Sequence, residues 1–246
     1  MRPLVLFLPA LLLDQRSWDL VLPLLPPEPE LERGFLDNPS ATDPSVSASA
    51  ALRAYETRLA ERIAREDRGR RIVVAGNSLG AYIAARVVAR TEGRDIACLA
   101  LGGLARLPRD LVVVRNGAAD QVERGDLAVG DVVTMLRDSA IAPEDRTDET
   151  ARLMSVMLEL LTRESLVWNL RLTAPLADDG WAVPPFTAPM TLLHGRADQT
   201  VPFACGEELA ALGSATRLVP LDTSSHVLPL SHPALVASEL KALLSA

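Results

Sequence analysis

Residues 72–81 read IVVAGNSLGA, a serine between two glycines that follows an apolar run and precedes a helix-like one. The pattern predicts a strand that ends in a sharp turn into a helix. Such a turn strains the backbone of its central residue, and Gly76 and Gly80 relieve the crowding around it. The turn lifts Ser78 above the carboxyl end of the strand, where open α/β sheets bind ligands. The helix that begins there also directs unpaired N–H groups, including that of Leu79, toward Ser78.

Other apolar runs repeat the strand-like pattern of this segment. They lie at residues 3–8, 96–103, 190–195 and 216–221, with a shorter pair at Phe35 and Leu36. Over residues 46–65 the apolar positions recur at three- and four-residue spacing, as in an amphipathic helix. Continuously apolar strands that alternate with helices predict an α/β fold, in which helices flank both faces of a mostly parallel sheet.

The alternation stops between residues 105 and 185. There the apolar residues recur at helical spacing, as Leu153 and Met157 do. We therefore expect residues 1–104 and 186–246 to form one α/β core. Residues 105–185 are expected to form a helical insertion over the edge of the sheet, and we call them the cap segment.

The composition of the 246 residues is that of an ordinary globular protein, large enough for one domain with an insertion. A formal net charge of -7 argues against a nucleic-acid partner, because phosphate binding needs a basic surface. The two cysteines, Cys98 and Cys205, predict reduced structural thiols. The histidines are not spaced as metal ligands, so neither a metal nor an organic cofactor is expected.

The first residues, MRPLVLFLPALLLDQRSW, are apolar enough to resemble a signal peptide. No small-residue cleavage pattern follows promptly, and Asp14, Gln15 and Arg16 interrupt the apolar run early. The run is also too short to span a bilayer. We expect a buried strand that leads into a loop, no membrane span, and a cytoplasmic protein.

A serine hydroxyl is a poor nucleophile at neutral pH and needs a base that an acid holds in place. Two later loops supply candidates for both. Asp198 follows one apolar run within HGRADQTVPF, and His226 follows another within DTSSHVLPLSHP. Ser78, Asp198 and His226 thus occur in the nucleophile–acid–base order of one hydrolase fold. The N–H of Leu79 is a ready donor for an oxyanion beside such a serine.

These segments resemble those of the α/β-hydrolase family. GNSLGA is similar to its nucleophile elbow, HGRADQTVP to its acid loop, SSHVLPLSHP to its histidine loop, and LPALLLDQRSWDLVLPLL to its oxyanion loop. The resemblance covers residues 3–103 and 186–246, and the segment between them resembles a helical cap in position and pattern. It implies a serine hydrolase in which the N–H of Leu11 joins that of Leu79 in the oxyanion hole.

Two segments depart from the family pattern. Pro9-Ala10 stands where His-Gly or Pro-Gly is usual, and LDNPSATDP stands where a Gly-His-Gly-x-Ser loop is common. Alanine adds a methyl group where the loop commonly uses the freedom of glycine. The altered loop keeps a second reaction open on the same serine. Carbon–carbon bond hydrolases of this fold resemble the GNSLGA form, and some relatives perform eliminations or cyclisations.

Several roles have more than one candidate on sequence alone. Asp120 and Asp126 are alternatives to Asp198, because the acid of this fold also comes from other strand ends. His194 is expected to close its strand without taking part in the reaction. His232 precedes a proline at a helix start and is expected at the surface.

The cap-segment residues that could line an acyl pocket are Met135, Met154, Met157, Leu158, Trp168 and Trp181. Of these, Met135, Met157 and Trp168 are the candidates for contact with substrate. Their spacing fits a helical core better than a pocket, but a cap above Ser78 must present some surface to it. The expected protein is a serine hydrolase that cleaves a small-molecule ester or thioester of an apolar, small-to-medium acyl group. A binding module without turnover is the alternative, and the complete serine–acid–histidine set argues against it. The oligomeric state stays open.

Overall fold

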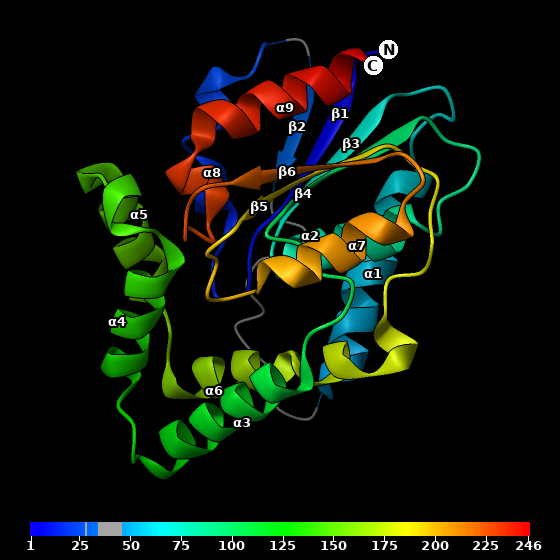
Figure 1. Ribbon diagram of the computed structural model, residues 1–246. Helices are drawn as coiled ribbons and strands as arrows, with labels where there is room; N and C mark the ends of the chain where they lie inside the picture. The colour runs from blue at the N-terminus through cyan, green and yellow to red at the C-terminus, as the bar shows by residue number, and fades with distance from the viewer. Residues whose placement is uncertain (28, 34–45) are drawn as a thin grey trace.

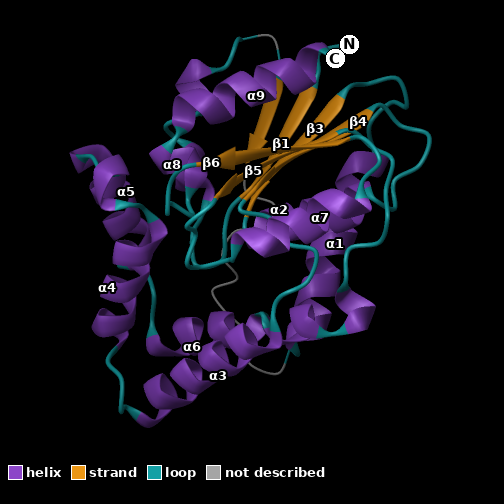
Figure 2. Cartoon of the chain, viewed as in Figure 1, coloured by secondary structure: helices purple, strands orange, loops and turns teal. Residues whose placement is uncertain are grey.

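The computed structural model describes residues 1–27, 29–33 and 46–246, and within them six parallel strands form one sheet (Figures 1 and 2). The strand order is β2-β1-β3-β4-β5-β6. Their bounds are β1 (Leu4–Leu8), β2 (Glu30–Arg33), β3 (Ile72–Asn77), β4 (Ile96–Leu101), β5 (Met190–Gly195) and β6 (Thr216–Leu221). The predicted α/β fold with a mostly parallel sheet is therefore confirmed.

Helices cover both faces of this sheet (Figure 1). One face carries α1 (Ala48–Ala64), α2 (Leu79–Val88) and α7 (Phe203–Leu212), and the other carries α8 (Leu228–Ser231) and α9 (Pro233–Ser245). The side chains of β1 alternate between the two cores, as the pleat of a strand requires. Leu4, Leu6 and Leu8 pack with residues of α1 and α2, whereas Val5 and Phe7 pack with residues of α9.

The strand at the edge of the sheet, β2, was not predicted from the sequence. It lies in PEPELERG, where charged residues hide the apolar run that marks a buried strand. An edge strand pairs on one side only and tolerates charge, which also discourages pairing between molecules. The strand expected at Phe35 and Leu36 lies outside the described residues.

The signal-like N-terminus forms a buried strand followed by a turn, as expected. Asp14 then caps a short 3-10 helix (Gln15–Trp18), because its carboxylate accepts a hydrogen bond from the Arg16 N–H at 2.8 Å. Trp18 is fully buried and packs on Phe7 with their ring centroids 4.9 Å apart. No helix in the described part of the chain is long and apolar enough to cross a membrane.

Between β4 and β5 the cap segment contains helices α3 (Arg109–Arg124), α4 (Val129–Ala140), α5 (Asp148–Leu158) and α6 (Arg163–Leu172). They lie to one side of the sheet and its flanking helices (Figure 2). Apolar residues of α4, α5 and α6 form a second core. Leu12, Leu13 and Val227, which belong to loops beside Ser78, join that core. The cap segment is therefore packed directly on the loops that follow the strands.

Candidate active site

Ser78 occupies the turn between β3 and α2 with a φ of 55° and a ψ of -114°. A non-glycine residue with positive φ is strained, and such strain persists only where the surroundings impose it. A Cβ added to Gly76 would lie 2.3 Å from the Gly80 carbonyl group, and one added to Gly80 would lie 2.4 Å from the Leu8 oxygen. Both glycines are thus required by close backbone approach, as the sequence predicted.

The structure brings Asp198 and His226 together, and His226 lines the same cavity as Ser78. Asp198 Oδ2 lies 2.6 Å from Nδ1 of His226, and both side chains are buried. Asp198 Oδ1 accepts hydrogen bonds from the N–H groups of Thr200 at 2.8 Å and Val201 at 3.0 Å. The carboxylate is therefore fixed by its own loop, and it fixes in turn the orientation of the imidazole.

Asp198 and the neighbouring His194 are buried and have shifted pKa values. Burial raises the pKa of Asp198, but the His226 ring and the Val201 N–H together lower it more, so the pKa lies below its ordinary value. Burial lowers the pKa of His194, whose Nε2 lies 2.9 Å from the Val201 carbonyl oxygen. At neutral pH Asp198 is thus ionised and His194 is neutral. His194 closes its strand, as expected.

The backbone of His226 is held from two sides. Asn77 Nδ2 donates to the carbonyl oxygens of Leu101 at 3.0 Å and His226 at 3.1 Å. The N–H of His226 donates to the Ala140 carbonyl at 2.8 Å. Gly102 has a φ of 54°, and a Cβ added there would lie 3.1 Å from the imidazole ring. Gly102, which directly follows β4, therefore leaves room for the histidine ring.

A polar cluster joins the cap segment to the histidine loop. Asp145 Oδ2 accepts hydrogen bonds from the hydroxyl groups of Thr223 at 2.7 Å and Ser225 at 2.6 Å. Ser225 Oγ also accepts the Ala142 N–H at 2.8 Å. Ser225 is fully buried and directly precedes His226. Asp145 was not predicted from the sequence, because its partners lie about eighty residues away along the chain and no local pattern marks them.

The expected oxyanion donors are the N–H groups of Leu11 and Leu79. Among the described residues, none accepts a hydrogen bond from either group, so both remain available to a ligand. The strain of the Pro9-Ala10 loop falls on Leu12, which has a φ of 67°, whereas Ala10 has no positive φ. The loop thus turns at a different residue from the one that the family pattern suggested.

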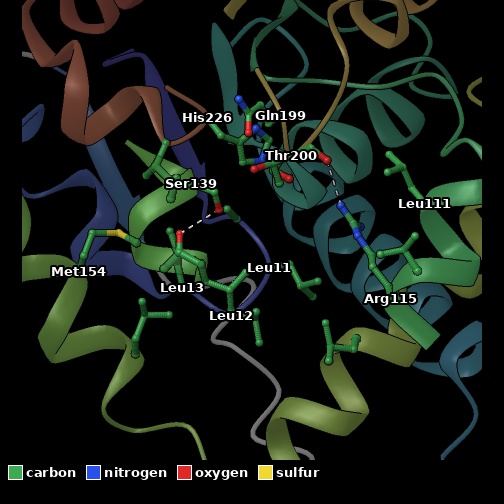
Figure 3. Close-up of a pocket in the computed structure, with 18 residues that line it drawn as sticks. Leu11, Leu12, Leu13, Leu111, Arg115, Ser139, Met154, Gln199, Thr200 and His226 are labelled. Carbon is green, nitrogen blue, oxygen red and sulfur yellow. Dashed lines mark hydrogen bonds between the residues drawn. The ribbon is translucent and has the colours of Figure 1, made fainter. Parts of the chain in front are cut away.

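A cavity of about 260 Å³ is lined by Ser78 and His226 (Figure 3). The oxyanion loop contributes Leu11, Leu12 and Leu13 to its wall. The cap segment contributes mostly apolar side chains, which are Leu111, Val114, Leu136, Met154, Leu158 and Leu170. Most of the wall is apolar, and polar groups gather around Arg115, Gln199 and Thr200.

The three cap residues expected to contact substrate lie elsewhere. Met135 is 54% exposed and Met157 is buried in the core of the cap segment. Trp168 lines a separate hollow with Arg163 and Arg171. Met154 and Leu158, two further residues that could line a pocket on sequence grounds, do line the cavity. Helical periodicity predicted the buried stripe of α5 but does not distinguish which of its residues borders a cavity.

The rival acids are far from the histidine. Asp120 pairs with Arg171 at 2.7 Å, and Asp126 pairs with Arg124 at 2.9 Å, both on the exposed side of the cap segment. His232 is partly exposed, and its Nδ1 lies 3.8 Å from Asp145 Oδ2. It is not among the residues that line the cavity.

Three comparisons with known proteins bear on this site. The model of the alpha/beta hydrolase family matches residues 5–239. A search of the curated proteins found no match. Among solved structures, similar ones include a thermophilic esterase from Thermogutta terrifontis, with 17% identity and a TM-score of 0.76 over 99% of this chain and 89% of the other.

Two further structures have comparable similarity. A hydrolase from Pseudomonas aeruginosa PA01 has 17% identity and a TM-score of 0.74 over 100% of this chain and 91% of the other. The enol-lactonase from Burkholderia xenovorans LB400 has 15% identity and a TM-score of 0.76 over 100% of this chain and 92% of the other. At these identities, the likeness is one of fold.

Proposed function

The chain is an enzyme of the alpha/beta hydrolase family, and on that premise we propose that it is a serine hydrolase with the triad Ser78, His226 and Asp198. Its substrate is a small-molecule carboxylic ester or thioester with an apolar, small-to-medium acyl group. The observation that carries the proposal is the strained Ser78, which lines one cavity with a His226 held at 2.6 Å by Asp198.

In the proposed reaction, Ser78 Oγ attacks the carbonyl carbon while His226 Nε2 takes the hydroxyl proton. The N–H groups of Leu79 and Leu11 stabilise the oxyanion. His226 then returns the proton to the leaving alcohol or thiol, and an acyl-enzyme remains on Ser78. Water, deprotonated by His226, attacks this ester, which releases the acid and restores the serine. Asp198 keeps Nδ1 of His226 protonated and stabilises the imidazolium.

The cap segment, residues 105–185, is assigned the role of a lid over this reaction. Its apolar side chains form one wall of the cavity and exclude water from the serine. Asn77 is the asparagine before the serine in the GNSLGA form, which suggested carbon–carbon bond hydrolysis. Its side-chain amide donates hydrogen bonds to the carbonyl oxygens of Leu101 and His226. It therefore has a structural role and gives no separate support to that reaction.

Labelling with a fluorophosphonate tests the proposal. We expect the wild-type protein to be labelled on Ser78 and to hydrolyse short-chain p-nitrophenyl esters. Ser78→Ala should abolish labelling, and His226→Ala should slow it by several orders of magnitude. His232→Ala is the matched control and should label normally. Labelling that persists in Ser78→Ala would contradict the assignment of the nucleophile.

A further inference from the structure

Arg115 places a cation in the apolar cavity. It lies in α3 on the cap side, and its guanidinium points across the cavity toward the loop that carries Asp198 (Figure 3). Its Nη2 donates to the carbonyl oxygen of Thr200 at 3.2 Å. Among the described residues, no carboxylate forms an ion pair with it. Other cap arginines do have such partners, as Arg171 does with Asp120 and Glu123.

The surroundings of Arg115 make this lone charge costly. The side chain is half-buried, and apolar residues such as Leu111 and Leu170 line the wall on its own side. Burial lowers the pKa of Arg115, and the negative charge of Asp198 offsets only part of this decrease. Arginine stays protonated despite such a shift, so the charge persists. Asp198 has both oxygens occupied by His226, Thr200 and Val201. It therefore compensates the cation only at a distance.

The guanidinium has donors to spare. It carries five N–H groups, of which one is used by the Thr200 carbonyl. The planar fork of a guanidinium matches the two oxygens of a carboxylate and binds them as a pair. Gln199, which precedes Thr200 in the chain, is exposed and adds a polar amide to the lining of the cavity. The part of the cavity around Arg115 is thus suited to an anion and the rest of the wall to an apolar chain.

A carboxylate fits this corner better than a phosphate. Arg115 is the single cation among the described residues that line the cavity. One positive charge balances one carboxylate, whereas a phosphate ester or a nucleotide carries more charge. The net charge of the chain, -7, further disfavours polyanionic ligands.

We propose, resting on the hydrolase function proposed above, that Arg115 binds a free carboxylate of the substrate. The substrate class is then the half-esters of dicarboxylic acids and related esters or thioesters that carry an acid group. The apolar chain between the two ends lies against Met154 and Leu158, which places the reacting carbonyl at Ser78 and the free acid at α3.

Two esters that differ in the free acid test the assignment. Monoethyl adipate carries a carboxylate where ethyl heptanoate carries a terminal ethyl group. In the wild-type enzyme kcat/KM should be higher for monoethyl adipate. Arg115→Gln should reduce the ratio of the two kcat/KM values by roughly tenfold or more, because a charge-assisted pair is lost. Arg115→Lys keeps the charge without the planar guanidinium, so its ratio of the two kcat/KM values should lie between those of the wild type and Arg115→Gln.

Arg137→Gln is the matched control, since it removes the same charge from an exposed position of the cap segment. It should leave the ratio of the two kcat/KM values at the wild-type value. An equal loss on both esters in Arg115→Gln, or a wild-type preference for ethyl heptanoate, would overturn the proposal. The first result would mean that Arg115 serves only to hold the Thr200 loop.

Calorimetry with adipate separates this proposal from the hydrolase function. Adipate should bind the wild-type protein and should bind Arg115→Gln at least tenfold more weakly. Arg115-dependent binding in a protein that hydrolyses neither ester supports the carboxylate site while overturning the hydrolase function. Hydrolysis of ethyl heptanoate without any binding of adipate overturns the carboxylate site alone.

Discussion

The sheet side of the cavity is built from backbone segments in close contact, whereas the cap side is built from apolar side chains on helices. On the sheet side, Gly76 and Gly80 leave no space for a Cβ atom. On the cap side, Gly117 of α3 has no atom within 4 Å of an added Cβ. The backbone contacts of the sheet side therefore fix the turn that carries Ser78, whereas the cap side shapes the cavity through its side chains. We therefore expect substitutions on the sheet side to affect the rate of the reaction, and substitutions on the cap side to affect substrate specificity.

The largest expected effect is a loss of stability from a substitution on the sheet side. Gly80→Ala places a methyl group 2.4 Å from the Leu8 oxygen, which has no room to move within the sheet. We expect the free energy of unfolding to fall by about 3 kcal/mol or more, as for severe overpacking. Gly117→Ala should instead raise it by about 0.5–1 kcal/mol, because alanine favours a helix. Urea denaturation measures both. Similar unfolding midpoints for the two variants would contradict the contrast.

The next effect concerns the bonds that join the two sides. Asp145→Ala removes the acceptor of the Thr223 and Ser225 hydroxyls and loosens the loop before His226. We expect kcat to fall about 10- to 100-fold, because a small misplacement of the base is costly. KM should change less. Glu144→Ala, an exposed neighbour in the same 3-10 helix, is the control. A parallel rise in KM with unchanged kcat would assign Asp145 to substrate binding instead.

The sequence predicted the sheet side better than the cap side for a physical reason. A strand–turn–helix needs glycine at fixed positions, so the local pattern of Gly76 and Gly80 is enough to identify Ser78 as the turn residue. The acid and histidine loops follow apolar runs in the same way. Arg115 and Asp145 have no such local cause, because their roles come from partners distant in the chain. Even the strand β2 was missed, since an edge position allows charge.

A smaller effect concerns specificity on the cap side. Met154 lines the cavity and Met157 lies one turn away in the cap core, and both are 2% exposed. Met154→Ala and Met157→Ala should lose similar amounts of stability, because each deletes a buried side chain from the same core. Met154→Ala alone should shift activity toward longer acyl chains, by roughly tenfold between neighbouring substrates in a series. Initial rates across p-nitrophenyl esters measure this shift. An equal shift in Met157→Ala would mean that the helix moves as a whole.

The pH dependence of stability reports on the sheet side through His194. Its pKa is lowered by burial in the folded protein and returns toward 6.5 in the unfolded chain. Below pH 6.5 the unfolded chain therefore binds a proton that the folded protein does not. As the pH decreases through this window, the free energy of unfolding should therefore decrease, by up to about 1.4 kcal/mol per pH unit. His194→Gln should flatten this fall in urea denaturation series. The lowered pKa of Asp198 acts at more acidic pH, so the two windows are distinct.

The smallest effect tests the loop where the two sides meet. If the family's usual glycine served a positive φ at position 10, Ala10→Gly would relieve strain and raise turnover. Ala10 has no positive φ, and the strained residue is Leu12 with a φ of 67°. Ala10→Gly should therefore cost about 0.5–1 kcal/mol of stability through chain entropy, and turnover should change by less than about threefold. Ala10→Val has less room, because Ala10 is 7% exposed and packs with the cap core, so it should slow turnover more than Ala10→Gly. Ester hydrolysis and urea denaturation measure both quantities. A large gain in turnover for Ala10→Gly would mean that the alanine, and not Leu12, limits how Leu11 N–H meets the oxyanion.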